Sequence, residues 1–167
     1  MKKELIIKIV GYLLIAMMIG TVLFIFINSM LPPEKSTEQS EAVKDIIVEI
    51  LPDNSKAENF VEEYIRKIAH FTEYGLLGIE LAVYLLLLHR RRPSLFGLAM
   101  TVPFFVGFID ESIQSLSGRG PLIEDVWIDI GGFATFYALT LAVGFSVIAI
   151  AWAIKTVKNK NKRGING

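Results

Sequence analysis

Four long apolar stretches dominate the sequence and limit what it can fold into. They cover residues 5–28, 68–88, 95–109 and 126–154. A helix needs about 20 predominantly apolar residues to cross a membrane, and the first, second and fourth stretches meet this length directly. The third is short, although it can extend to residue 113. It also contains Pro103, which a spanning helix tolerates when its neighbours satisfy the freed carbonyl.

The composition also favours a membrane protein over a soluble domain. Of 167 residues, 53% are hydrophobic, and the mean hydropathy is +0.51, which is too apolar for an ordinary soluble domain. We therefore predict an all-α integral membrane protein with four spanning helices. The net charge of zero gives no argument for a nucleic-acid partner. Because the chain has no cysteine, it can form neither disulfides nor a thiolate metal site.

Basic residues gather beside one set of span ends. Three lysines lie within the first eight residues, Arg90–Arg92 follows the second stretch, and five basic residues lie between positions 155 and 163. Residues 32–67 instead contain nine acidic and five basic residues. Because cytoplasmic loops carry the excess of Lys and Arg, we predict that both termini and the Arg90–Arg92 turn are cytoplasmic. The acidic loop and the loop near residues 114–124 then face outward.

These features divide the chain into four parts. We expect residues 1–31 to form an N-terminal transmembrane anchor helix, residues 32–59 an extracytoplasmic loop, residues 60–154 a transmembrane domain of three helices, and residues 155–167 a basic cytoplasmic tail. The first apolar stretch is longer than a signal-peptide core and has no Ala-x-Ala site after it, so we predict an uncleaved anchor. In the loop, apolar residues recur at helical spacing from Ala42 to Leu51. This pattern predicts a short amphipathic helix that lies on the outer membrane surface or packs on the loop itself.

Polar side chains cluster at or just inside the ends of the last three stretches, on one side of the predicted membrane. They are His70, Glu73 and Tyr74 in the second stretch, Asp110, Glu111 and Gln114 in the third, Arg119 in the next turn, and Asp125 and Asp129 in the fourth. Ionisable groups at membrane depth are rare and usually mark a site or a pathway. At 100° per residue, the three residues of the second stretch share one face, and Asp110 shares a face with Gln114. Glu111 points about 100° away from that face.

Arg119 and three further residues, Glu80, Gly75 and Gly78, bear on the arrangement of this cluster. Arg119 is the expected partner of the acids and the only cation of the cluster with a planar fork suited to carboxylate or phosphate. Glu80 lies two turns deeper than Glu73, where charge is costly, so we expect it to be protonated or paired. Gly75 and Gly78 are expected to let a neighbouring helix approach.

Three uses of the cluster stay open from the residues alone. It can be a buried network that holds three helices in register, a ligand-binding or relay site, or an enzyme active site in which paired carboxylates and one histidine transfer protons. One histidine with several carboxylates is not the usual zinc ligand set, so we predict no metal and no cofactor. A hard, oxygen-bound ion such as Mg²⁺ bridging to a lipid phosphate is compatible with the same residues.

Two blocks of residues carry a resemblance to a known family. Residues 66–78 read Arg-Lys-Ile-Ala-His-Phe-Thr-Glu-Tyr-Gly-Leu-Leu-Gly, and the second block contains Asp110-Glu111-x-x-Gln114, Gly118-Arg119 and Asp125-Val126-x-x-Asp129-x-x-Gly132. Together they resemble the R-K-x-A-H-F-x-E-Y-x-x-L-G and D-E-x-x-Q, G-R, D-V-x-x-D/N-x-x-G motifs of the VanZ-like family of bacterial membrane proteins. The match covers roughly residues 60–140. Leu116-Ser117 and Gly120-Pro121 depart from the pattern without touching a charged position.

The resemblance implies a multi-pass protein of the bacterial cell membrane that is associated with low-level teicoplanin resistance. Because the polar residues are expected at headgroup depth, the expected partner is a membrane lipid, a lipid-linked wall precursor or a lipidated glycopeptide. A membrane enzyme that acts on a phospho-headgroup and a structural partner of another envelope protein are the alternatives. A membrane-protein partner or a homo-oligomer fits the same chain.

Overall fold

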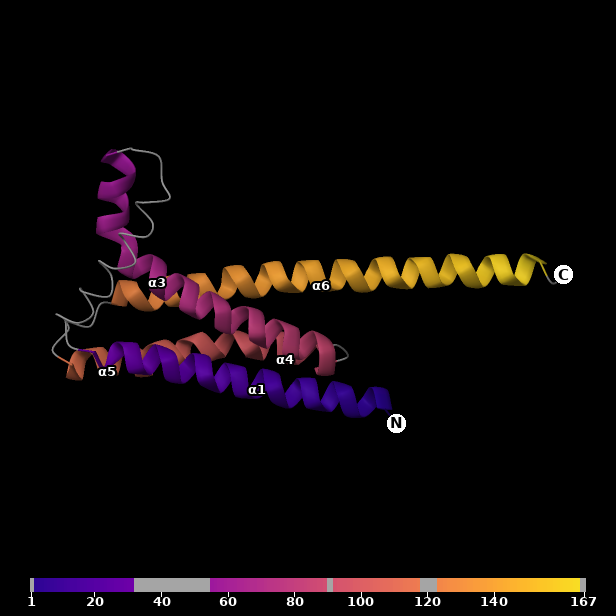
Figure 1. The fold of residues 1–167 in the computed structure, drawn as a ribbon, viewed down its shortest axis with the longest axis horizontal. Helices are drawn as coiled ribbons and strands as arrows, with labels where there is room; N and C mark the ends of the chain where they lie inside the picture. The colour runs from indigo at the N-terminus through magenta and orange to yellow at the C-terminus, as the bar shows by residue number, and fades with distance from the viewer. Residues whose placement is uncertain (1, 32–54, 90–91, 118–122, 166–167) are drawn as a thin grey trace.

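The computed structural model describes residues 2–31, 55–89, 92–117 and 123–165, all of them in helices or short turns. Figure 1 shows the helices packed roughly side by side along one axis. They are α1 (Lys2–Ser29), α3 (Ser55–Tyr84), the π-helix η1 (Leu85–His89), α4 (Pro93–Leu98), the 3₁₀ turn η2 (Ala99–Thr101), α5 (Val102–Leu116) and α6 (Ile123–Ile165). The predicted all-α class is confirmed. The predicted amphipathic helix at 42–51 lies outside the described residues.

Four helical segments are long and apolar enough to cross a membrane. They are Glu4–Ser29, Tyr64–His89, Pro93–Leu116 and Glu124–Asn159, which confirms the four predicted spans. The outside of the bundle is apolar, and the side chains of Tyr12, Phe108 and Trp152 are each at least 70% exposed. Such a surface suits lipid as the surrounding solvent, because lipid tails impose no penalty on exposed apolar groups.

The third span is not one continuous α-helix. It consists of α4, the 3₁₀ turn η2 and α5, with Pro103 at the start of α5 and buried. Proline lacks a backbone N–H and its ring crowds the preceding turn, so a change of helical geometry just before it is expected. Tyr137 on α6 donates a hydrogen bond of 2.9 Å to the Phe96 carbonyl in α4, which ties the first part of this span to the bundle.

Helix α6 is much longer than a membrane requires. Its 43 residues span about 65 Å at 1.5 Å per residue, about twice the hydrocarbon thickness. It continues through Ile165 and therefore through most of the predicted basic tail. In Figure 1 its C-terminal part extends beyond the N-terminus of α1, and both termini lie at the same end of the bundle.

Helices α3 and α6 pack closely through small residues. A Cβ added at Gly78 would lie 2.6 Å from the Phe133 carbonyl oxygen and 3.2 Å from the Tyr137 nitrogen. A Cβ at Gly132 would likewise meet the Phe71 backbone. Only glycine allows backbones to approach this closely, so the predicted close approach at Gly78 is confirmed. This contact fixes the register between the two helices that carry His70 and Asp129.

Candidate functional site

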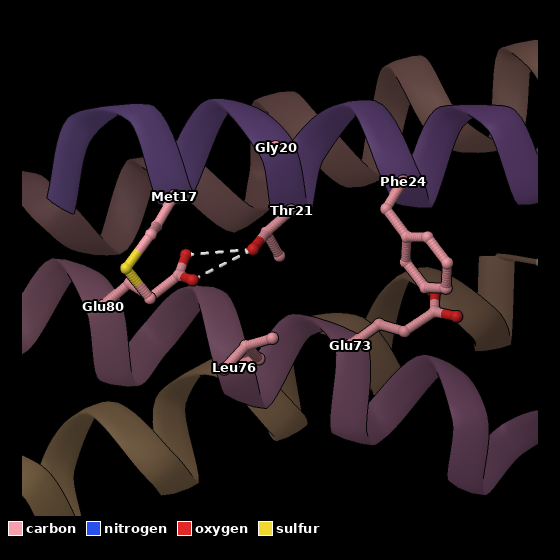
Figure 2. Close-up of a pocket in the computed structure, with 7 residues that line it drawn as sticks. All are labelled: Met17, Gly20, Thr21, Phe24, Glu73, Leu76 and Glu80. Carbon is pink, nitrogen blue, oxygen red and sulfur yellow. Dashed lines mark hydrogen bonds between the residues drawn. The ribbon is translucent and has the colours of Figure 1, made fainter. Parts of the chain in front are cut away.

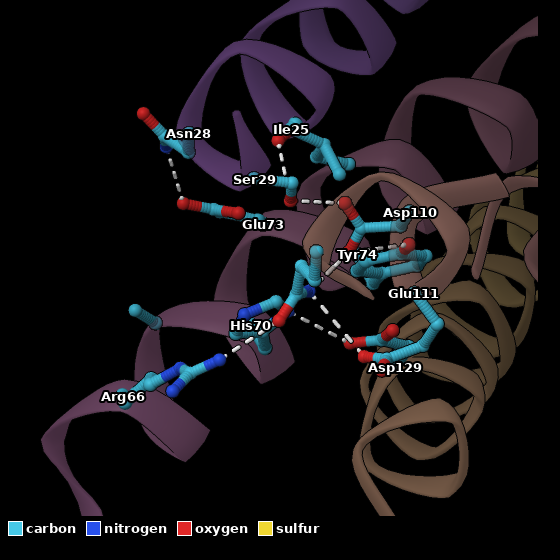
Figure 3. Close-up of polar contacts among 12 residues, drawn as sticks. Ile25, Asn28, Ser29, Arg66, His70, Glu73, Tyr74, Asp110, Glu111 and Asp129 are labelled. Carbon is cyan, nitrogen blue, oxygen red and sulfur yellow. Dashed lines mark hydrogen bonds and ion pairs between the residues drawn. The ribbon is translucent and has the colours of Figure 1, made fainter. Parts of the chain in front are cut away.

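The predicted polar residues that the structure describes meet at one end of the bundle. Figure 3 shows side chains from four helices directed toward one another: the end of α1, the first half of α3, the end of α5 and the start of α6. We call the set of His70, Glu73, Tyr74, Asp110, Glu111, Gln114 and Asp129 the polar cluster. Asp110, Gln114 and Asp129 are fully buried, and Glu111 is 7% exposed.

His70 lies between two aspartates that come from different helices. Its Nδ1 atom is 3.2 Å from Asp129 Oδ1 on α6 and 3.7 Å from Asp110 Oδ2 on α5. The side chain of His70 is 12% exposed, whereas both aspartates are fully buried. Among the described residues, these three offer nitrogen and oxygen atoms close enough to hold one ion, within 4.8 Å of one another.

Asp110 accepts hydrogen bonds from three helices. Ser29 at the end of α1 donates to Asp110 Oδ1. Tyr74 on α3 donates to Oδ2 at 3.4 Å, and Gln114 one turn along α5 donates to the same oxygen at 3.3 Å. Buried carboxylates are costly unless such donors surround them, so Asp110 is held in a fixed orientation.

Gln114 connects Asp110 to two further residues. Its amide nitrogen is 3.3 Å from Glu111 Oε1, and its amide oxygen accepts a 2.8 Å bond from Arg66 Nη2. Glu111 therefore joins the polar cluster through Gln114, although its helical angle pointed it away from Asp110. The guanidinium group of Arg66 contacts the polar cluster, so the prediction that Arg119 is its only guanidinium group is wrong. Arg119 itself lies outside the described residues.

Glu73 and Asp125 lie at the edges of the cluster. Glu73 accepts a 3.0 Å hydrogen bond from Asn28 on α1. Asp125 is 7% exposed and lies one turn before Asp129 on α6. Glu73 therefore lies where α3 meets the end of α1, and Asp125 lies in the first turn of α6.

Sequence reasoning missed three residues of this site. Asn28, Ser29 and Arg66 make direct contacts with Glu73, Asp110 and Gln114, respectively. Asn28 and Ser29 end an apolar span, and that position gave no sign that α1 would meet α3 and α5 there. Ser117 adds a second contact, donating a 2.9 Å bond to the Ser29 carbonyl.

A pocket on the apolar outside of the bundle reaches the edge of the polar cluster at Glu73. It has a volume of about 320 Å³ and lies between α1 and α3, with Glu73 near one end and Glu80 near the other, as Figure 2 shows. Apolar side chains of Met17, Phe24 and Leu76 line it and remain 48–54% exposed. The Thr21 hydroxyl lies 3.0 and 3.1 Å from the two Glu80 oxygens, which identifies the expected partner of Glu80.

Comparison with known protein families gives one assignment. A model of the VanZ/LLP1 family matches residues 9–147, which is most of the chain. The chain belongs to the VanZ/LLP1 family. Comparison with curated proteins and with solved structures gives no match. The region matched to VanZ/LLP1 contains the polar cluster, the pocket and the contact between α3 and α6, so these features lie within the family domain.

The chemistry of this VanZ/LLP1 site follows from its donors and acceptors. It gathers carboxylates and one imidazole at one end of the bundle, beside an apolar pocket between α1 and α3. Carboxylates recognise ammonium groups, metal ions and hydrogen-bond donors. The pocket can accommodate a segment of an acyl or isoprenyl chain, since it falls within the size range of ligand pockets.

Proposed function

We propose that this VanZ/LLP1 protein holds a membrane-anchored molecule of the bacterial envelope in the outer leaflet of the cell membrane. A lipidated glycopeptide and a lipid-linked wall precursor share the required chemistry: a polar head joined to a long hydrocarbon chain. The VanZ-like resemblance adds low-level teicoplanin resistance as the expected outcome. The observation that carries the proposal is the lipid-facing pocket that ends at Glu73, beside the polar cluster.

The geometry of the pocket supports this type of ligand. Glu73 and Glu80 are seven residues apart on α3, which corresponds to about 10 Å along the helix. A head group at Glu73 and Asn28 would therefore leave its chain lying along Leu76 and Phe24 toward the bilayer centre. Each buried methylene contributes about 0.8 kcal/mol, so membrane anchoring concentrates such ligands at this depth.

The distribution of basic residues supports the choice of leaflet. The C-terminal part of α6 lies at the end of the bundle that holds both termini, as Figure 1 shows, and its sequence includes Lys155 and Lys158. Basic residues favour the cytoplasmic side, and the polar cluster lies at the opposite end of the spans. We therefore propose cytoplasmic termini and an outer-leaflet site.

Lipid retention by the purified protein tests the proposal. The protein is extracted in mild detergent, and bound molecules are identified by native mass spectrometry and by lipid extraction. Gly20 lines the pocket, and a Cβ there meets no atom within 4 Å, so we expect Gly20→Leu to narrow the pocket without a clash at its Cβ. Gly97 on α4 is equally open but lies outside the pocket, which makes Gly97→Leu the matched control.

The expected result is a retained envelope lipid in the wild type and in Gly97→Leu, with at least a severalfold loss in Gly20→Leu. Equal retention by all three proteins would place the ligand elsewhere. Absence of any retained lipid from well-folded protein would instead favour a structural partner of another envelope protein.

A further inference from the structure

In contrast to the prediction of no metal from the sequence alone, we propose that His70, Asp110 and Asp129 form a binding site for a single divalent transition-metal ion. This proposal does not depend on the lipid-binding proposal. The three residues come from α3, α5 and α6, and their ligand atoms all lie within 4.8 Å of one another. Cis ligands at about 2.1 Å from a metal are separated by about 3.0 Å in octahedral and about 3.4 Å in tetrahedral geometry. The observed separations from His70 Nδ1, 3.2 Å to Asp129 and 3.7 Å to Asp110, are near these values.

The unsatisfied atoms of the site also point to an ion. Within the part of the chain that the structure describes, both oxygens of Asp129 and the Nδ1 atom of His70 are buried and form no hydrogen bond of proper geometry. The Nδ1 atom of His70 and Oδ1 of Asp129 form only an ion-pair contact of 3.2 Å. Asp129 is fully buried. Buried carboxylate oxygens without partners are rare and costly. A metal ion between the two aspartates would coordinate the free lone pairs of Asp129 and His70 together.

Charge balance favours the same conclusion. Two ionised aspartates would bring two negative charges into a buried region, and a protonated His70 would offset only one of them. A divalent cation offsets both and leaves the imidazole neutral, which is the form that binds metals. Asp110 is oriented by donors from Ser29, Tyr74 and Gln114, the kind of supporting shell that fixes metal ligands.

The mixed donor set indicates the class of metal. Imidazole nitrogen favours zinc, iron and related transition metals, whereas carboxylate oxygen suits manganese and harder ions. One imidazole with two carboxylates therefore fits Mn²⁺ or Zn²⁺ better than Mg²⁺ or Ca²⁺, which prefer all-oxygen sites. Three protein ligands leave at least one coordination position open to water.

Metal titration of the purified protein tests the site. The protein is stripped with EDTA in mild detergent and titrated with Mn²⁺, followed by the electron paramagnetic resonance signal of the free ion. Calorimetry and elemental analysis measure Zn²⁺. We expect one ion per chain, and a loss of affinity of at least about tenfold in His70→Gln and Asp129→Asn. Glu80→Gln is the matched control, because Glu80 is a buried carboxyl residue that hydrogen-bonds to Thr21 outside the site.

If these variants lose stability, a substitution that replaces one metal-binding side chain by another still tests the proposal. Asp129→Cys supplies a thiolate, which suits zinc and not manganese, so it should retain Zn²⁺ and lose Mn²⁺. Metal binding should also raise the Tm of the wild type but not that of Asp129→Asn. Failure of the wild type to bind either ion, or unchanged affinity in folded His70→Gln, would overturn the proposal. Lipid retention is measured separately and would be unaffected by that failure.

Discussion

The contact between α3 and α6 should be sensitive to a single methyl group at Gly78. Gly78→Ala places a Cβ 2.6 Å from the Phe133 carbonyl oxygen, which belongs to the backbone and cannot rotate away. Ordinary contact begins near 3.4 Å, so the helices must separate locally by about 0.8 Å. Overpacking of this kind costs about 1–3 kcal/mol. The same separation would lengthen the 3.2 Å contact between His70 and Asp129, because these residues lie on the two separating helices.

Thermal unfolding in detergent measures this effect. The fluorescence of Trp127 and Trp152 on α6 reports the transition, and about 1 kcal/mol corresponds to about 2–4 °C in Tm for a soluble domain of this size. Gly97→Ala is the control, because a Cβ there meets no atom within 4 Å and alanine favours the helix by up to about 1 kcal/mol. A Gly78→Ala protein as stable as Gly97→Ala would refute the close backbone contact.

Three further predictions concern other parts of the molecule. Cysteine at exposed Ser115 should react with an impermeant maleimide in intact cells and cysteine at exposed Ser94 should not; the opposite labelling would invert the proposed topology. Thr21→Val removes the hydroxyl that donates to Glu80 and should lower the free energy of unfolding by about 0.6–1.7 kcal/mol, whereas Thr21→Ser should restore it; equal stability of the two variants would count against this bond. Arg66→Ala leaves the buried Gln114 oxygen without its 2.8 Å donor and should lower the free energy of unfolding by about 1–3 kcal/mol. An unchanged unfolding curve would show that water replaces the guanidinium group.

The four spans could be predicted because lipid permits few solutions. Backbone groups in hydrocarbon must be satisfied within the segment, so a long apolar stretch has to be a helix. Hydropathy could not show the end of α6, because lysine-rich segments outside the lipid remain good helix formers. Nor could it locate the 3₁₀ turn at Ala99–Thr101, for which Pro103 was the only local signal.

The candidate site was predictable only in part, for reasons of register. Helical periodicity placed His70 and Glu73 on one face, but the contact between His70 and Asp129 joins residues 59 positions apart and depends on how α3 slides against α6. The contacts of Asn28 and Arg66 depend on similar registers. Arg66 also resembled an ordinary flanking charge, so nothing local distinguished it from a topology signal.

Susceptibility to paired glycopeptides tests whether the protein acts on ligands that are anchored in the membrane by a lipid tail. The protein is expressed in a sensitive Gram-positive host, and the shift in susceptibility is compared for glycopeptides with a lipid tail and for their tail-less analogues. Glu73→Gln and Asp125→Asn should each reduce the shift at unchanged membrane abundance, whereas Glu124→Gln should not, because Glu124 is an exposed acid beside Asp125. We expect a larger shift in susceptibility for the tailed compounds, and we expect this shift to depend on Glu73 and Asp125. Equal protection against both classes, or none from a well-expressed protein, would contradict it.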